Sequence, residues 1–229
     1  MRTNLPETFA RPTFDYKTTA QFGTYRTFAT TARVTHVVRS IAYSYDDTPS
    51  AGWLLIDVNA ATPRTLFKID IPVASRKQLL FPGGIYGLAG EQLRVGVGAP
   101  GVGKNVKTST KVYSMHGLPE VEAAPTFFNH SPAANTAATT GDIAAAAGVT
   151  HVLDWVYWSF DRATGQATSL TITAGTTTLA KVDIVSGFSG VGEPLIFPGG
   201  IYGSANELLN VTLSADNGGA IGKLNVRYR

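Results

Sequence analysis

The sequence predicts an all-β protein made of two tandem, internally duplicated β-sandwich domains of jelly-roll-like type, with an extended N-terminal arm. Three observations predict this fold. Charged residues make up only 15% of the 229 residues, and glycine is frequent, which is typical of strands joined by short turns. Short segments of alternating apolar and polar residues are separated by turn residues. The third observation is a seven-residue phrase, FPGGIYG, which occurs at 81–87 and again at 197–203.

The repeated phrase belongs to a longer set of matches between the two halves of the chain. The segment VTHV at 34–37 recurs at 149–152, and KIDI at 68–71 recurs as KVDI at 181–184. We therefore interpret the chain as one domain present twice. The predicted organisation is an arm at 1–23, a first copy at 24–115, a linker at 116–127 and a second copy at 128–229.

Within each copy, period-two patterns predict a series of short strands. In the first copy the predicted strands cover 33–45, 53–58, 65–71, 93–97 and 106–114. In the second copy they cover 150–160, 169–173, 179–184, 208–213 and 224–228. Each copy is long enough to bury a core of its own.

The FPGGIYG phrase has the residues of a type II turn. Proline sets φ at the first corner of such a turn, and glycine supplies the positive φ at the second. Because both copies contain the phrase, we predict a structural role in both, with a ligand-binding loop as the alternative. The residues of this predicted repeated turn are Pro82, Gly83, Gly84, Pro198, Gly199 and Gly200.

The arm at 1–23 matches nothing in the second copy. It has two prolines and four aromatic residues, with no strand or helix period. Three of the aromatic residues are Phe9, Phe14 and Tyr16. Exposed aromatic side chains are unfavourable, so we expect these three to contact the arm's own domain or a neighbouring subunit. A flexible tail is the alternative.

The net charge of +3 is unevenly distributed. Residues 24–115 contain eleven Lys and Arg against five Asp and Glu, whereas residues 128–229 contain five against seven. The basic surface of the first copy therefore indicates a face that fits one acidic protein partner, or a surface with no partner at all. Nucleic acid is disfavoured because no basic cluster is interleaved with aromatic residues. We expect no membrane partner, because no apolar run approaches about 18 residues.

The residues do not predict an enzyme. The stretch at 98–105, GAPGVGKN, resembles a phosphate-binding loop, but Asn105 stands where Ser or Thr is needed and a strand pattern follows. His36 and His151 occupy matching positions in apolar strands, so we expect a role in the fold. The chain has no cysteine, which excludes disulfides and thiolate metal sites and favours assembly in a reducing cytoplasm. We predict no catalytic residue, cofactor or metal site.

Short motifs of the second copy, from Thr150-His151-Val152-Leu153 to Gly222-Lys223-Leu224-Asn225, resemble β-sandwich structural proteins of tailed bacteriophages. Ala42-Tyr43-Ser44-Tyr45 carries the same resemblance in the first copy. The resemblance implies a virion protein assembled in the host cytoplasm, namely a head decoration (cement) protein whose partner is the major capsid protein. Self-association as a homotrimer is expected, since three chains would present six similar domains around one three-fold axis. The arm would then contact a neighbouring subunit or the capsid.

Three alternatives remain open at this point. A tail or baseplate component differs from a decoration protein in its attachment site only. A carbohydrate-binding module would use the aromatic residues Trp155, Tyr157 and Trp158, although these cannot all lie on one face of a strand. A major shell protein is disfavoured because each copy is small.

Overall fold

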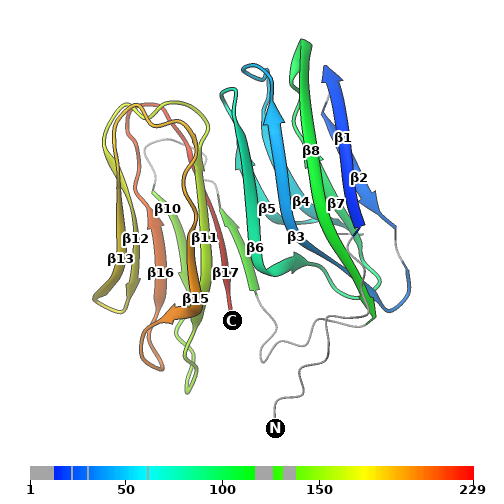
Figure 1. Cartoon of the computed structure of the whole chain (residues 1–229). Coiled ribbons are helices and arrows are strands. Elements are labelled where there is room, and N and C mark those ends of the chain that lie inside the picture. Colours follow the sequence, from blue (N-terminus) through cyan, green and yellow to red (C-terminus); the bar gives the residue numbers. More distant parts are fainter. Residues whose placement is uncertain (1–12, 22, 30, 61, 117–125, 131–137) are drawn as a thin grey trace.

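The structure is a computed structural model that describes residues 13–21, 23–29, 31–60, 62–116, 126–130 and 138–229 (Figure 1). All the regular structure of these residues is β, which confirms the predicted fold class. Two clusters of buried apolar side chains form the cores of two domains.

The first domain is a sandwich of two antiparallel sheets. Sheet A has the order β1 (Thr13–Gln21), β8 (Gly101–His116), β3 (Val34–Tyr45) and β6 (Arg76–Tyr86). Sheet B has the order β2 (Thr24–Phe28), β7 (Gln92–Val97), β4 (Trp53–Asn59) and β5 (Arg64–Asp70). These two strand orders, 1-8-3-6 and 2-7-4-5, are those of an eight-stranded jelly roll.

The second domain repeats this strand order. Sheet C has the order β9 (Thr126–His130), β17 (Gly222–Tyr228), β11 (Val152–Phe160) and β14 (Gly190–Val191), and β15 (Leu195–Tyr202) also pairs with β11. Sheet D has the order β10 (Thr139–Ile143), β16 (Leu209–Leu213), β12 (Thr168–Ala174) and β13 (Thr177–Ile184). β14 and β15 together take the place that β6 has in the first domain, so the second domain is also a jelly roll.

The predicted arm contains the first strand of the first domain. β1 pairs with β8 from Thr13↔Val112 onward, and it occupies the place that β9 has in the second domain. Residues 13–21 therefore lie on their own domain. Of the three aromatic residues predicted to make contacts, Phe9 lies outside the described residues, and Phe14 and Tyr16 lie in β1, where only their backbone is described. β9 begins within the predicted linker.

The FPGGIYG phrase differs from the prediction of a turn between two strands, because its first six residues lie inside β6 and inside β15. In β6, Leu80 pairs with Ser40 and Ile85 pairs with Val38, so four residues bulge out opposite one. β15 has the same irregularity opposite β11. The glycines of both bulges have the positive φ that the prediction required: Gly83, Gly84, Gly199 and Gly200. The two residues that precede them, Pro82 and Pro198, are exposed.

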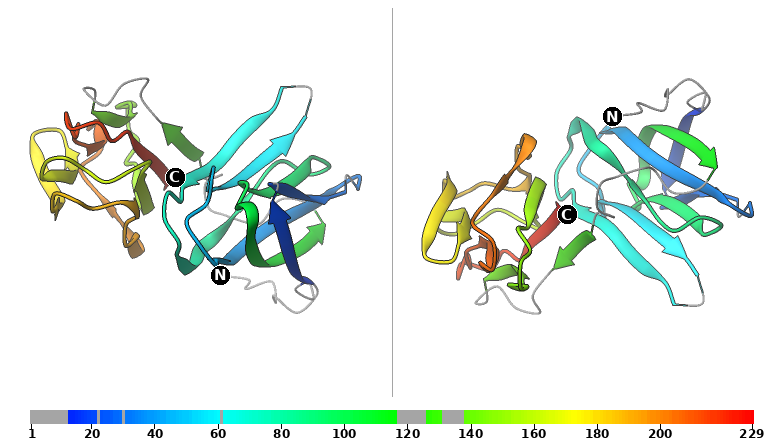
Figure 2. Two further views of the ribbon diagram at one scale, coloured as in Figure 1. Left: turned by 90° about the horizontal axis from the view of Figure 1, so that it is seen from above. Right: turned by 90° about the horizontal axis from the view of Figure 1, so that it is seen from below.

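The outer face of sheet C covers the edge of the first domain that β5 and β6 form (Figures 1 and 2). Trp155 and Tyr157, on β11, have no exposed surface and belong to the core cluster of the first domain. The ring of Tyr157 lies 5.4 Å from that of Phe67, and the ring of Trp155 lies 6.1 Å from that of Phe81. The two domains thus share a packed apolar junction.

Polar side chains of the second domain also bind the backbone of this edge. Asn225 accepts a hydrogen bond from the Lys68 N–H at 2.7 Å and donates one to the Lys68 carbonyl at 2.8 Å. Lys223 forms a salt bridge of 2.5 Å with Asp70, and both side chains are 15% exposed. The Asp70 N–H donates to the Ser159 hydroxyl at 3.1 Å. Edge-strand groups that would otherwise be open to pairing are therefore satisfied within the chain.

Candidate functional site

The junction removes the aromatic side chains that the sequence suggested for carbohydrate binding. Trp155 and Tyr157 are fully buried between the domains, and Trp158 is 4% exposed in the core of the second domain. Both faces of this strand are therefore core, and the alternative of a carbohydrate-binding site on these three side chains has no exposed aromatic surface to use. Any sugar-binding or partner-binding surface has to lie elsewhere.

The outer face of sheet B presents an aromatic–arginine cluster, which consists of Tyr25 (β2), Trp53 and Asp57 (β4) and Arg94 (β7). Tyr25 is 44% exposed, and its ring lies 5.8 Å from that of Trp53. The guanidinium of Arg94 lies over the Tyr25 ring, 4.9 Å from its centroid. Trp, Tyr and Arg are the residue types that contribute most to binding energy at protein interfaces. Their gathering at one exposed place makes this cluster the candidate site.

Two features hold the cluster in place. Arg94 donates two hydrogen bonds to the Asp57 carboxylate, at 2.8 and 2.6 Å, and this bidentate contact raises the pKa of Arg94 above its ordinary value. On the strand between Tyr25 and Trp53 is Gly96, where a Cβ atom would lie 2.5 Å from the Tyr25 ring. A side chain at this position would displace the ring, so the glycine lets Tyr25 lie across the sheet.

The second domain lacks this cluster. Strand pairing places Thr140, Ser169 and Asn210 where the first domain has Tyr25, Trp53 and Arg94. The cluster was not predicted from the sequence. The available signal was that aromatic and basic residues of the first copy have small polar counterparts in the second.

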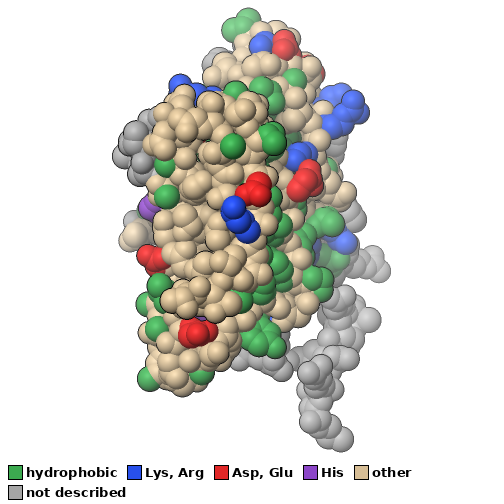
Figure 3. Space-filling model, turned by 90° about the vertical axis from the view of Figure 1, so that its left-hand side faces the viewer, with side chains coloured by type: hydrophobic (Ala, Val, Ile, Leu, Met, Phe, Trp, Pro, Cys, Tyr) green, Lys and Arg blue, Asp and Glu red, His purple; other side chains and the backbone are tan. Residues whose placement is uncertain are grey.

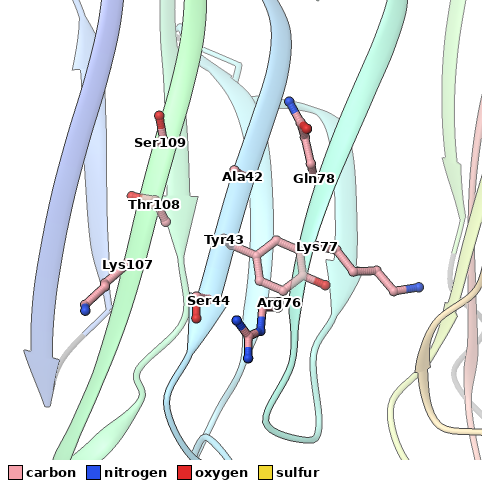
Figure 4. Close-up of a pocket in the computed structure, with 9 residues that line it drawn as sticks. All are labelled: Ala42, Tyr43, Ser44, Arg76, Lys77, Gln78, Lys107, Thr108 and Ser109. Carbon is pink, nitrogen blue, oxygen red and sulfur yellow. The ribbon is translucent and has the colours of Figure 1, made fainter.

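The outer face of sheet A holds a shallow hollow of about 410 Å³ (Figure 4). Ala42 and Ser44 of β3 form its floor, and Lys107 of β8 and Arg76 of β6 are among the side chains around it. Ala42 stands at the position that Tyr157 has in sheet C, because Ala42 pairs with Ser109 as Tyr157 pairs with Asn225. The hollow is present because the small Ala42 stands where the second domain has Tyr157, whose ring fills the junction between the domains.

The other residues singled out from the sequence make contacts that belong to the fold. His36 and His151 hydrogen-bond the carbonyls of Ala29 and Ala144, each at 2.9 Å, so the two copies use their histidines in the same way. The stretch that resembles a phosphate-binding loop leads into β8 and not into a helix. In the described part of the chain, no group of three or more His, Asp or Glu side chains is placed to hold a metal ion. No helix in that part is long and apolar enough to span a membrane.

Comparison with known proteins gives matches to solved structures alone. No family model and no curated protein matches the chain. A structure described as the triple jelly roll fold and turret assembly of an archaeal virus matches 97% of the chain at 16% identity, with a TM-score of 0.33. The chain spans 59% of that protein's length. A structure of PBCV-1 VP54, fitted into a reconstruction of the virophage Sputnik, matches 95% of the chain and 94% of its own length at 9% identity, with a TM-score of 0.30.

A further match is the PBSX exported protein XepA, with 96% of the chain and 86% of that protein covered at 9% identity and a TM-score of 0.25. Several of the matched structures are thus structural proteins of viruses. The jelly-roll assignment of this chain rests on its own strand orders.

Proposed function

We propose that the protein is a non-enzymatic structural protein of a virion, namely a head decoration (cement) protein that binds the major capsid protein and self-associates as a homotrimer. The observation that carries the proposal is the aromatic–arginine cluster, whose Tyr25 ring is exposed on the basic first domain. The sequence resemblance to tailed-phage structural proteins gives the class of protein. The protein would bind the capsid shell through the surface that this cluster forms.

The architecture supports a static role of this kind. The junction buries Trp155 and Tyr157 between the two jelly rolls, and hydrogen bonds and a salt bridge cross it. Large buried aromatic contacts of this kind make relative domain motion unfavourable. A rigid two-domain block that binds through one domain and projects the other is suited to a shell protein.

Charge supports the choice of partner. Residues 24–115 have a net charge of +6 and residues 128–229 one of −2, so the first domain is the one attracted to an acidic protein surface. Binding through it is expected to weaken as salt rises, because exposed charges are screened within about 10 Å at 0.1 M salt. The first domain would face the shell, with the second domain turned outward.

The test is cosedimentation of the protein with undecorated phage heads. Tyr25→Thr introduces the residue type that the second domain has at the matching position, and Thr is compatible with an edge strand. We expect this variant to lower the affinity for heads about tenfold or more, as for interface residues of this type. The control is Leu88→Thr, which removes an exposed apolar side chain of the first domain outside the cluster.

Equal binding by both variants would contradict the role of the cluster. No binding of the unaltered protein to heads would contradict the decoration function itself. Binding to isolated tails or to a glycan, lost in Tyr25→Thr, would instead support a tail component or a carbohydrate-binding module.

A further inference from the structure

The second domain has an edge that corresponds to the covered edge of the first, and none of the described sheets covers this edge. We call it the second-domain edge; it consists of β13 and β15, the counterparts of β5 and β6. Tyr86 of the first domain is 8% exposed and lies against Phe127, whereas its counterpart Tyr202 is 59% exposed. Figure 3, which views the molecule from the second domain's side, shows scattered charges among neutral side chains.

A sheet face that corresponds to the one covering the first edge also has no other sheet packed against it in the described structure. Sheet A is the counterpart of sheet C, and the outer side chains of its β3 and β8 can be compared with those of β11 and β17 by their pairing. Ser44 pairs with Lys107 as Ser159 pairs with Lys223. Thus the serine and the lysine that bind Asp70 across the junction have identical counterparts on sheet A.

The second-domain edge has the counterpart of their target. Asp183 pairs with Ser169 in β12 as Asp70 pairs with Trp53 in β4, and each aspartate follows a lysine by two residues. Asp183 is exposed, and among the described residues its ion-pair partner is the nearby Lys181, at 2.9 Å. Asp183 is therefore exposed, whereas its counterpart Asp70 is largely buried in the junction.

The apolar parts of the two open surfaces also correspond. In the junction, Tyr157 of the face meets Phe67 of the edge. On the open surfaces these positions are Ala42 and Ala180, so small side chains replace large ones on both sides and the two backbones could approach closely. Phe197, the counterpart of Phe81, remains partly exposed at the second-domain edge, opposite the hollow of sheet A in such a contact.

From this correspondence we propose that the second-domain edge of one chain binds the outer face of sheet A of a second copy, with Asp183 paired to Lys107 of the second copy. The contact repeats between chains the edge-to-face packing that joins the domains within a chain. Such a contact is heterologous, and it closes into a ring when the rotation between copies allows. The inference names the surfaces of the self-association that the proposed function includes, and it is independent of the capsid site on sheet B.

Charge reversal with restoration tests this pairing. Asp183→Lys and Lys107→Asp each place like charges together, and we expect each to weaken self-association of the full chain about tenfold or more. Combining both in one chain restores opposite charges, so the double variant is expected to associate within about threefold of the unaltered protein. Sedimentation equilibrium over a range of concentrations measures these constants.

The control is Asp47→Lys, which makes the same charge change at another exposed position. Three results would each overturn the proposal. Asp47→Lys weakens association as much as Asp183→Lys, the double variant does not recover, or the unaltered protein stays monomeric. Failure of head binding leaves this result unaffected, because association is measured without heads. Conversely, Tyr25→Thr should leave the association constant unchanged.

Discussion

The two domains have the same strand order but differ in what covers the edge formed by their fifth and sixth strands. In the first domain, sheet C covers this edge, and Phe81 of the FPGGIYG phrase is 1% exposed. In the second domain the same phrase has no covering element in the described structure, and Phe197 is partly exposed. The comparison shows that one local sequence fills two roles, core in one copy and surface in the other, depending on whether a sheet face lies against it.

The largest effect is expected from replacing the matched phenylalanines. Phe81→Ala leaves a cavity beside Trp155 and Tyr157, and we expect it to lower the free energy of unfolding by about 3–5 kcal/mol. Phe197→Ala removes a side chain that is already partly hydrated, so its cost should be about half of that or less. Chemical denaturation of the two variants measures both values. Equal losses would show that the two edges are covered to the same extent.

The next largest effect on stability is expected at Asp216, a buried carboxylate in a loop of the second domain. The matching loop of the first domain has no carboxylate. Asp216 is 1% exposed and accepts hydrogen bonds from the N–H groups of Gln166, Gly218 and Ala220, at 2.9–3.0 Å. Burial raises the pKa of Asp216, but these N–H groups outweigh it and lower the pKa below the ordinary 3.8. Its contribution to stability is therefore present above that value and is lost as pH falls through the lowered pKa.

We expect Asp216→Asn to lower the unfolding free energy at pH 7 by about 1–3 kcal/mol, because the amide replaces one acceptor oxygen. It should also remove part of the loss of stability below pH 4. Denaturation curves between pH 2 and 7 test both. An unchanged acid dependence in the variant would show that other carboxylates determine it.

The smallest difference is expected between the two bulges. Gly83 and Gly199 have φ values of 75° and 87°, so alanine at either position is strained by about 1–2 kcal/mol. At Gly83 a Cβ atom would also lie 2.3 Å from the guanidinium of Arg227, which a 2.7 Å contact with Asp154 holds in place. At Gly199, no atom of the described residues lies within 4 Å of such a Cβ. Gly83→Ala should therefore cost about 1 kcal/mol more than Gly199→Ala in thermal unfolding. The same cost for both would mean that Arg227 moves freely.

The strands with alternating apolar residues could be predicted from the sequence. The elements that depend on backbone pairing, namely β1 and the bulges, could not. β1 lies on an edge and pairs through main-chain hydrogen bonds with β8, which leaves little pattern in its side chains. The FPGGIYG glycines have the predicted positive φ, but they form a bulge in place of a corner, because proline and glycine serve both structures.

The junction could not be predicted, since it depends on which face of one domain meets the other. A signal was nevertheless present in β11, which has large apolar residues on both faces: Trp155 and Tyr157 on one, Trp158 and Phe160 on the other. A strand that is apolar on both faces is buried on both. The aromatic–arginine cluster was missed for a different reason, because its residues lie far apart in the sequence and come together by the pairing of three strands.

The most direct test of this account is hydrogen exchange of the backbone amides of β5 and β13 in the full chain, at low and at high protein concentration. We expect the Lys68 and Asp70 amides to be protected at both concentrations, because Asn225 and Ser159 accept hydrogen bonds from them within the chain. The Lys181 and Asp183 amides should exchange quickly in dilute solution and become protected as the chains associate. Fast exchange in β13 at every concentration, in a protein that does associate, would show that this edge stays uncovered and that the chains associate through other surfaces.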